Sequence, residues 1–402
     1  MTPDDPVSAE RTSVTPVRRH DLDRLRILAV LLLFVFHTAR IFDVDEAFYA
    51  KNSQTSQWLT WGVVQFLNPW HMPLLFVLAG AATWFALGFR TPSTYARERT
   101  RRLLVPFLFG VIVIVPPQAY LAQRLLPNGE TSYVAFLGDY WQMKGDLSGY
   151  TGQFTPGHLW FILYLFLFSL IALPLFVRIR RVAGGPSGRD IGRPWMLAAV
   201  PAVMLLVGAL PSPEGAWSPF TTLVLFIAGF ILLSSESLQT TVRRWWPWFL
   251  AAGVVTMALE LGIDASNVND GWGDFSWPQA GFGLVEASNT WLWVLGLIGG
   301  AGAYLNGPGT PTLRYANEAA YPCYILHQTV IAAVGYVVVQ WDLGVWSKYI
   351  VILIASFTLT VGLYDVAVRR TNPTRFLFGL KPKKRMTTRR TAAARPAATT
   401  PR

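Results

Sequence analysis

The chain has 402 residues, of which 52% are apolar, 14% aromatic and 14% charged, and its mean hydropathy is +0.35. Soluble domains carry charges at roughly 25% of positions, so this chain has too few to cover a water-facing surface. The single cysteine, Cys323, excludes a disulfide scaffold. The net charge of +11 is not by itself a sign of nucleic-acid binding, because membrane proteins carry basic loops for another reason. The composition therefore predicts an all-α integral membrane protein.

A transmembrane helix needs about 20 predominantly apolar residues. Ten stretches meet this requirement, which predicts about ten transmembrane helices in one bundle. Asn68-Pro69 predicts a break in the second stretch, and Pro116-Pro117 predicts a kink or an end in the third. The ten stretches are residues 25–42, 62–89, 103–122, 159–177, 195–211, 218–234, 245–262, 283–304, 319–341 and 348–368.

The distribution of Lys and Arg predicts the orientation, because both are enriched in cytoplasmic loops. With a cytoplasmic N-terminus, 29 of the 34 Lys and Arg residues lie in cytoplasmic segments, and both termini are cytoplasmic. Residues 1–17 lack an apolar core with a cleavage site, so we expect the first helix to be an uncleaved anchor. The predicted parts are a cytoplasmic segment 1–19, a membrane domain 20–370 and a basic, disordered cytoplasmic tail 371–402 that suits anionic lipid.

Four histidines lie within or at the ends of the predicted spans, where titratable side chains are costly and point to function. On the predicted orientation, all four can meet in the outer half of the bundle. They are His37, His71, His158 and His327. A single histidine of this kind is often only a hydrogen-bonded core residue. Haem ligation by paired histidines is a further, weaker interpretation.

The first predicted helix carries a polar stripe. Arg26 and His37 are 11 residues apart, which is three turns plus about 20°, so they share one face about 16 Å apart along the axis. Asp23 and Arg40 fall within about 60° of the same stripe. Arg26 alone fits an arginine that extends to the membrane interface. Together with His37 on one face of a span, it indicates a functional role.

A basic cluster precedes the third predicted span, in the sequence YARERTRRLLVP. Arg99 and Arg102 are i, i+3 neighbours on a helix, with Arg97 and Arg101 nearby. Arginine binds phosphate through two parallel hydrogen bonds, so the cluster suits a nucleotide or polyphosphate. Ordinary cytoplasmic positive charge is the alternative explanation.

These motifs resemble the acyltransferase-3 membrane family, and their residues are most similar to those of a glucan-biosynthesis branch of it. The opening HDLDRLRILAVLLLFVFHTARIFD is similar to the family's first helix, in which ten residues separate Arg from His. NPWHMPLLFVLAG, RERTRRLLVPFLFG, GHLWFILYLF and YPCYILHQTV resemble later family segments. The resemblance covers residues 20–180 and 315–380, whereas 181–314 carries no motif on which we rely. Many relatives have Ser-Gly where this chain has Ala79-Gly80, so we assign no chemistry there.

The resemblance implies that an acyl group, acetyl or succinyl, moves from cytoplasmic acyl-coenzyme A to a hydroxyl of an envelope glycan or a related acceptor. It implies that His37 is the essential histidine, with Arg26 as its partner on the same helix. It also implies that Arg99 and Arg102 bind the phosphates of the donor.

Histidine suits removal of a proton near neutral pH, so we expect His37 to act as general base. Direct transfer and an acyl-histidine intermediate both remain open. Glu260 is a possible partner of His37. No metal or prosthetic group is predicted. The side chains expected to bind the acceptor or support the site are His71, His158, His327, Arg40 and Asp23.

The alternative function is a multi-pass transporter or flippase of an anionic or sugar-linked substrate, which would use the same polar features without chemistry. The sequence has no visible inverted repeat or paired broken helices to support it. Residues 123–157 form the longest outer loop and can cover a binding site. We expect a multi-pass protein of the bacterial plasma membrane. Its expected partners are acyl-CoA, a carbohydrate or other hydroxyl-bearing acceptor and the lipid bilayer, without nucleic acid.

Overall fold

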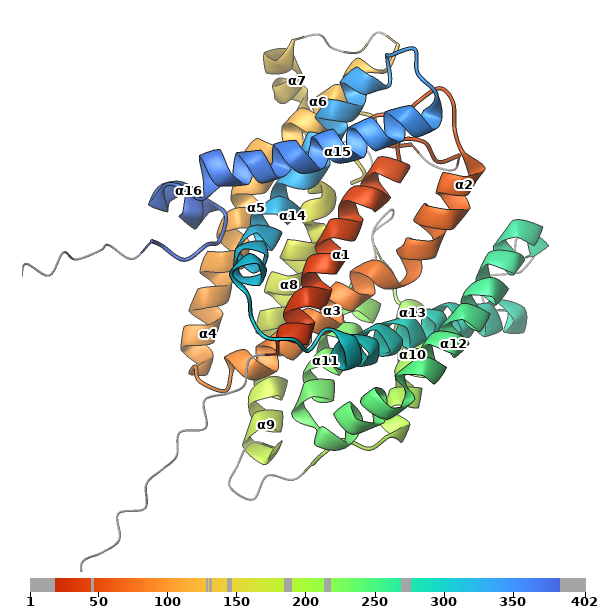
Figure 1. Ribbon diagram of the computed structural model, residues 1–402, viewed down its shortest axis with the longest axis vertical. Coiled ribbons are helices and arrows are strands. Elements are labelled where there is room, and N and C mark those ends of the chain that lie inside the picture. Colours follow the sequence, from red (N-terminus) through yellow and green to blue (C-terminus); the bar gives the residue numbers. More distant parts are fainter. Residues whose placement is uncertain are drawn as a thin grey trace, which may run out of the picture.

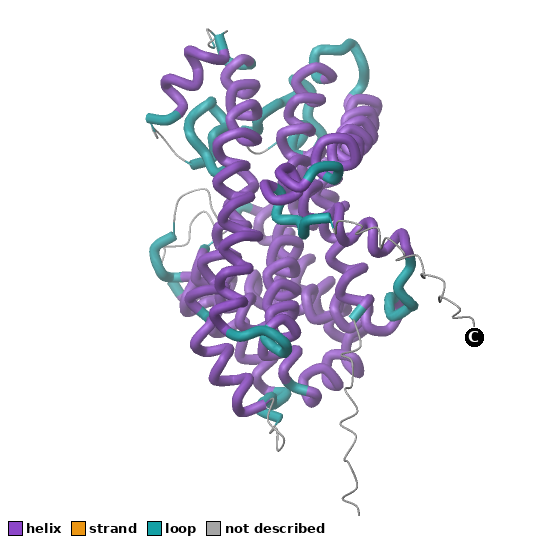
Figure 2. The backbone as a smooth tube through the Cα atoms, turned by 90° about the vertical axis from the view of Figure 1, so that its left-hand side faces the viewer, coloured by secondary structure: helices purple, strands orange, loops and turns teal. Residues whose placement is uncertain are grey.

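The computed structural model describes residues 19–44, 47–127, 129, 132–142, 147–183, 190–212, 218–268 and 276–383. These residues form helices joined by turns and loops, with no strand among them (Figure 2). The all-α prediction is therefore confirmed for the described part of the chain. Of the predicted N-terminal segment only Arg19 is described, and residues 384–402 of the predicted tail lie outside the described residues.

The first half of the chain contains two long helices in which α-helical and π-helical segments alternate. The first consists of α2 (Gln57–Leu59), η1 (Thr60–Gln65) and α3 (Phe66–Ala86). The second consists of α4 (Pro92–Arg99), η2 (Thr100–Leu104), α5 (Val105–Phe109), η3 (Gly110–Ile114) and α6 (Val115–Arg124). The other elements are α1 (His20–Ala39), α7 (Tyr133–Tyr140), the 3₁₀ turn η4 (Gly157–Leu159), α8 (Trp160–Ile171) and α9 (Leu173–Ala183).

The second half forms two groups of helices. The first group is α10 (Trp195–Gly208), α11 (Pro219–Ser234), α12 (Glu236–Ser266) and α13 (Trp277–Tyr304). The second group returns to α1 and comprises α14 (Pro311–Val338), α15 (Val345–Leu363), the π-helical η6 (Tyr364–Val368) and α16 (Asn372–Leu377).

Several helices begin at the same sequence signal, a Ser or Thr followed within two residues by Pro. The hydroxyl oxygens of Thr91, Ser276 and Thr310 accept hydrogen bonds from backbone N–H groups three residues later, at 3.1 to 3.3 Å. These bonds satisfy donors that have no partner within the helix, and proline at the first or second position has no such donor to lose. The capping signals therefore define where α4, α13 and α14 start.

Each of the ten predicted stretches coincides with a helical segment. Within the described residues, five helices are long and apolar enough to cross a membrane, and the pair α8 and α9, bent by 57°, makes a sixth if it is one span. Helices α10 and α11 are apolar but shorter, with 14 and 16 residues. The chain is therefore a multi-pass membrane protein, whereas ten spans and two cytoplasmic termini stay predictions.

The predicted break at Asn68-Pro69 and the predicted end at Pro116-Pro117 are wrong, whereas a kink at Pro116-Pro117 stays a prediction. The helix that contains Asn68-Pro69 is continuous over Gln57–Ala86, and the one that contains Pro116-Pro117 is continuous over Pro92–Arg124. A π-helical segment precedes each proline site, η1 in the first helix and η3 in the second. In a π-helix, each N–H bonds the carbonyl five residues before it instead of four. This shifted pattern allows the helix to continue past a proline, which has no N–H to donate.

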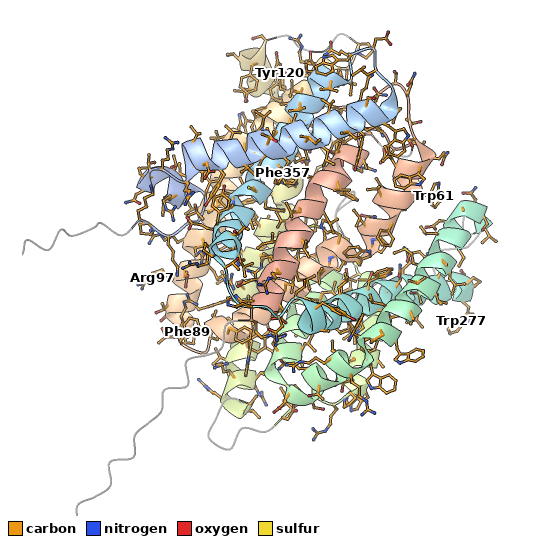
Figure 3. All side chains as sticks on the ribbon, viewed as in Figure 1. Trp61, Phe89, Arg97, Tyr120, Trp277 and Phe357 are labelled. Carbon is orange, nitrogen blue, oxygen red and sulfur yellow. The ribbon has the colours of Figure 1, made fainter. Side chains whose placement is uncertain are left out.

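Helix α1 lies at the centre of the bundle, against α3, α13, α14 and α15 (Figure 1). The outside of the molecule carries large apolar side chains that point away from it, such as Phe89 and Trp277 (Figure 3). Trp277 is 91% exposed. An apolar exterior of this extent requires lipid rather than water around it.

Two prolines inside helices each leave a backbone carbonyl free to accept a hydrogen bond from a neighbouring helix. Pro73 has no N–H for the carbonyl four residues before it, and that carbonyl accepts a hydrogen bond from Thr290 of α13 at 2.8 Å. The carbonyl left free by Pro201 of α10 accepts a bond from the indole of Trp291, also at 2.8 Å. In an apolar surrounding an unsatisfied carbonyl costs several kcal/mol. These two bonds therefore fix α13 against α3 and α10.

Helices α3 and α11 cross with their backbones in contact. A Cβ added at Gly80 would overlap the carbonyl oxygen of Phe226, and one added at Gly229 would overlap that of Val77. Small residues allow such close approach of helices in membranes. Gly80, the second residue of the Ala79-Gly80 pair, therefore has a packing role.

The C-terminal part of the folded domain extends further than predicted. Helix α16 packs on α5, and the guanidinium of Arg375 pairs with Glu318 of α14 at 2.7 Å. Arg375 is 7% exposed. Residues 371–380 thus belong to the folded structure, and the predicted tail starts too early because α16 is too short and polar to stand out by hydropathy.

Gly80→Ala tests the crossing of α3 and α11. We expect it to lower stability by about 1–3 kcal/mol, because the added methyl group forces the two backbones apart. Gly262→Ala in α12 is the matched control, since a Cβ there meets nothing within 4 Å. Thermal unfolding of the purified variants measures both effects. An unchanged melting temperature for Gly80→Ala would contradict the proposed packing.

Candidate active site

Two cavities lie at different depths beside α1. The arginine cavity, of about 350 Å³, is lined by Arg26 near the start of the helix. The histidine cavity, of about 450 Å³, is lined by His37 and Arg40 near its end. The polar stripe predicted on this helix is therefore divided between two cavities.

The arginine cavity carries a surplus of positive charge. Glu98 is the acidic residue in its lining, and it pairs with Arg90 at 2.6 Å and with Arg102 at 3.3 Å. The arginines that line the cavity are Arg26, Arg90, Arg99 and Arg102. The predicted neighbours Arg99 and Arg102 thus meet in one cavity with Arg26, and Arg90 adds a cation that the sequence alone does not single out.

Arg99 is held by groups on two helices. Its guanidinium donates to the Thr83 hydroxyl of α3 at 3.1 Å and lies 4.9 Å from the centre of the Tyr95 ring. The hydroxyls of Thr83 and Tyr95 are themselves 3.1 Å apart. A guanidinium fixed in this way loses less conformational entropy when it binds an anion.

Arg102 is held through its side chain and its backbone. Its Nε donates to the Gly379 carbonyl at 3.2 Å, beyond the end of α16. Pro106 has no N–H for the Arg102 carbonyl, and this carbonyl accepts a bond from the Tyr321 hydroxyl at 3.0 Å. The Arg102 side chain is 45% exposed, so this end of the cavity reaches the surface.

His37 stands at the centre of an aromatic cluster in the histidine cavity. Its ring centre lies 5.1 Å from that of His327, which in turn lies 4.9 Å from that of His158. The ring also stacks on Phe48 at 5.9 Å. The Nδ1 atom of His37 is buried and has no hydrogen-bond partner. The Nδ1 atom of His158 also has no partner, but the His158 ring is held through its Nε2 atom, 2.9 Å from the Ile325 carbonyl.

The other histidines are bound to backbone carbonyls. The Nε2 atom of His71 lies 2.6 Å from the Ala29 carbonyl of α1, and that of His158 lies 2.9 Å from the Ile325 carbonyl of α14. Both residues line the histidine cavity, whereas His327 is fully buried behind it. These bonds occupy the Nε2 atoms that haem ligation by His71 or His158 would use. Among the described residues, no three or more His, Cys, Asp or Glu side chains are placed to hold a metal ion.

A buried ion cluster closes the loop after α1. Asp43 is fully buried and pairs with the Arg40 guanidinium at 2.5 Å and with the Lys51 ammonium. Arg40 also lies 5.9 Å from the Phe48 ring, which stacks on His37. Asp43 therefore positions Arg40 at the edge of the histidine cavity.

The predicted outer loop covers the histidine cavity, as expected. Ser148, Tyr150 and Thr155 line it, and the Tyr49 hydroxyl donates to the Ser148 carbonyl at 2.8 Å. The Tyr140 hydroxyl of α7 donates to the Thr155 carbonyl at 3.2 Å. Burial raises the pKa of Tyr140 to about 12, so this phenol stays protonated and remains a donor.

Besides His327, two predicted polar residues lie outside both linings. Asp23 is 3.8 Å from the Arg26 guanidinium and so acts on the arginine cavity through that side chain. Glu260 accepts a bond from Asn289 of α13 at 2.6 Å, and this places it with α13 rather than beside His37. No lining residue of either cavity comes from the described part of 181–314, the region without a family motif.

Tyr324 and Asp43 are site residues that sequence reasoning missed. Tyr324 lines both cavities, and it lies three residues before His327 within the motif YPCYILHQTV. Tyrosines are common in apolar helices, so only the position of Tyr324 between the two cavities identifies it as a site residue. Asp43 shows its role only once the loop brings it onto Arg40 and Lys51.

Comparison with known proteins identifies the family of the chain. Residues 19–365 match the acyltransferase domain of the acyltransferase-3 family. The chain belongs to this family. The match includes both cavities and the helices that line them, and it supports an acyltransferase activity in the membrane.

Curated relatives are similar over nearly their whole length. The chain is 22% identical to Glucans biosynthesis protein C of Escherichia coli (strain K12) over 389 residues, which is 91% of this chain and 95% of the relative. It is also 22% identical to the Glucans biosynthesis protein C of Shigella dysenteriae serotype 1 over 388 residues, with the same coverage. No solved structure matches the chain significantly.

Asp43→Asn tests the ion cluster. We expect a loss of about 3–5 kcal/mol in stability, because the neutral amide leaves two cations near one buried site without their counter-charge. Asp365→Asn is the control, because Asp365 pairs with Arg369 while 41% exposed, and exposed pairs contribute at most about 1 kcal/mol. Thermal unfolding of both variants in detergent provides the comparison. Equal effects would contradict a special role for Asp43.

Proposed function

We propose that this chain is a membrane-bound O-acyltransferase that moves an acyl group from acyl-coenzyme A in the arginine cavity to an acceptor hydroxyl in the histidine cavity. The observation that carries the proposal is that one helix, α1, presents Arg26 to the first cavity and His37 to the second. An anion-binding site and a candidate base are thereby placed at a fixed separation. Family membership supports the reaction type.

The arginine cavity suits the phosphates of coenzyme A. Arg99 and Arg102 are pre-positioned by Thr83 and Gly379, and planar guanidinium groups bind phosphate through paired hydrogen bonds. The cavity reaches the surface at Arg102, and the basic segments around it are those predicted to be cytoplasmic. A donor bound there has its anionic part at the surface and its acyl arm directed into the bundle.

The histidine cavity suits a carbohydrate. Aromatic rings that can pack on sugar faces line it beside polar groups that can bind hydroxyls, and a neutral polyol needs both. The aromatic members are Phe36, Phe48, Tyr49, Tyr150, Trp160 and Tyr164, and the polar ones include Asn68 and Gln328. The glucan-related relatives agree with a sugar-bearing acceptor.

The chemistry follows from a neutral His37. Its ring accepts the proton of the acceptor hydroxyl while the hydroxyl oxygen attacks the thioester carbonyl carbon. The new C–O bond forms, the C–S bond breaks, and the proton leaves with the coenzyme A thiolate. An acyl-histidine intermediate would use the same ring as nucleophile and would release the thiol before the acceptor binds. Acetyl and succinyl remain our expected acyl groups.

A transporter or flippase is the second candidate, because two cavities on opposite sides of a thin layer also fit a transport path. The two functions differ in one product. Only a transferase releases free coenzyme A in proportion to acylated acceptor, whereas a transporter leaves the thioester intact.

His37→Ala tests the base. We expect acyl transfer to fall by 10²-fold or more, because general bases contribute about 10² to 10⁴ to rate. Release of coenzyme A from acyl-CoA in nanodiscs measures the change. His20→Ala is the control, since His20 lies at the start of α1 and lines neither cavity. Full activity of a folded His37→Ala protein would remove His37 from the mechanism.

Arg99→Ala combined with Arg102→Ala tests the donor site. Acyl-CoA at 100 times its Kd should stabilise the wild type by about 2.7 kcal/mol, and this gain should vanish in the double variant. The pair Arg97→Ala and Arg101→Ala removes the same charge from exposed side chains outside the lining, one of which is labelled in Figure 3. Thermal unfolding with acetyl-, succinyl- and longer acyl-CoA gives both results. If the two double variants lose the gain equally, general positive charge rather than a built site attracts the donor.

A further inference from the structure

The two cavities are separated by a single layer of side chains. On α1, Val30 lines the arginine cavity and Leu33 the histidine cavity. On α3, Leu75 lines the first and Met72 the second. Three helical residues rise about 4.5 Å, which is less than the length of a tyrosine side chain. The layer is therefore thin on both helices.

Tyr324 of α14 is the residue that lines both cavities. Its ring centre lies 5.5 Å from that of Phe161, which faces the arginine cavity, and 5.7 Å from that of His158, which faces the histidine cavity. Tyr324 is only 4% exposed. Its ring thus occupies the layer itself rather than the wall of one cavity.

One hydrogen bond holds the Tyr324 side chain across the layer, because its hydroxyl donates to the His158 carbonyl of η4. This is the hydrogen bond that rotation of the side chain would break. The backbone around it is held separately. The Tyr324 carbonyl contacts the His327 ring at 2.6 Å, and the Ile325 carbonyl contacts the His158 ring. Rotation of the Tyr324 side chain therefore leaves both histidine-to-backbone bonds in place.

We propose that Tyr324 is a gate between the two cavities and determines whether the acyl group reaches the acceptor or water. The inference rests on the proposed function, since a donor in one cavity and a base in the other must meet through this layer. With the ring in place, the acyl arm stays in the arginine cavity. When the ring turns aside, the thioester carbonyl reaches His37. Without the ring, water from the histidine cavity attacks the thioester, the C–S bond breaks, and a carboxylic acid and the free thiol form.

Accessibility of cysteines on α3 tests the gate. In a Cys323→Ala background, Met72→Cys places a thiol in the histidine cavity and Ala79→Cys places one in the arginine cavity. A charged, membrane-impermeant methanethiosulfonate reagent is added to one side of sealed vesicles or to the other. With Tyr324 present, each thiol should react from one side only. With Tyr324→Ala, each should react from both sides, at a rate at least tenfold higher on the formerly closed side.

Two variants separate the gate from general damage. Tyr324→Leu fills part of the space and should give intermediate rates if the ring itself closes the layer. Tyr321→Ala removes a neighbouring ring that lines only the arginine cavity and should leave labelling one-sided. Two-sided labelling with Tyr324 present, or one-sided labelling in both the alanine and leucine variants of Tyr324, would overturn the proposal.

The labelling experiment needs no acyl-CoA, so its result does not depend on the proposed function. If the wild type neither binds nor cleaves acyl-CoA but shows the labelling pattern, the gate holds and the transferase fails. If the wild type transfers acyl groups, Tyr324→Ala should release coenzyme A without acceptor at least tenfold faster than wild type. An unchanged ratio of hydrolysis to transfer in that variant would overturn the gate and leave the transferase in place.

Discussion

Inside an apolar bundle, a backbone carbonyl that has lost its helical partner has few other hydrogen-bond donors nearby. In this protein, side chains from neighbouring helices donate the missing hydrogen bonds. Thr290, Tyr321 and Trp291 each donate to a carbonyl that a proline has left without its helical partner. The rings of His71 and His158 contact carbonyls of α1 and α14. Such bonds are directional, so they fix how far one helix slides along another. The two cavities keep their shapes because the surrounding helices are held in register.

The length of α1 sets the spacing of the site. Arg26 and His37 share a helical face, but the helices packed against α1 differ along its length, and a layer of side chains divides the face. Four arginines line one cavity and three histidines line the other, where Arg40 is paired with Asp43. We therefore expect an anionic group and a neutral polar group to bind at separate ends of α1. A rigid helix, rather than a flexible loop, fixes the distance between Arg26 and His37.

Periodicity in the sequence was enough to predict the shared face of Arg26 and His37, and apolar length was enough to predict a helix at every apolar stretch. The clustering of the histidines was predicted from their depth in the predicted spans. Three features were beyond these signals. The π-helical segments that let the helices continue past Pro69 and Pro116 have no composition signal. The approach of Asp43 to Lys51 depends on a loop conformation. The place of Tyr324 between two cavities depends on the simultaneous packing of α1, α3, α8 and α14, which no single helix encodes.

The end of the folded chain anchors one side chain of the arginine cavity, since Arg102 is bound by the carbonyl of Gly379, while Arg26 of the same cavity lies in the first helix. Chains fold from the N-terminus as they are synthesised. Both cavities have all their lining residues once Gln328 of α14 has been made, whereas the bond that anchors Arg102 waits for the segment after α16. A nascent chain therefore has the linings of both cavities before Arg102 gains its anchor, and a chain that stops before Gly379 leaves Arg102 without it.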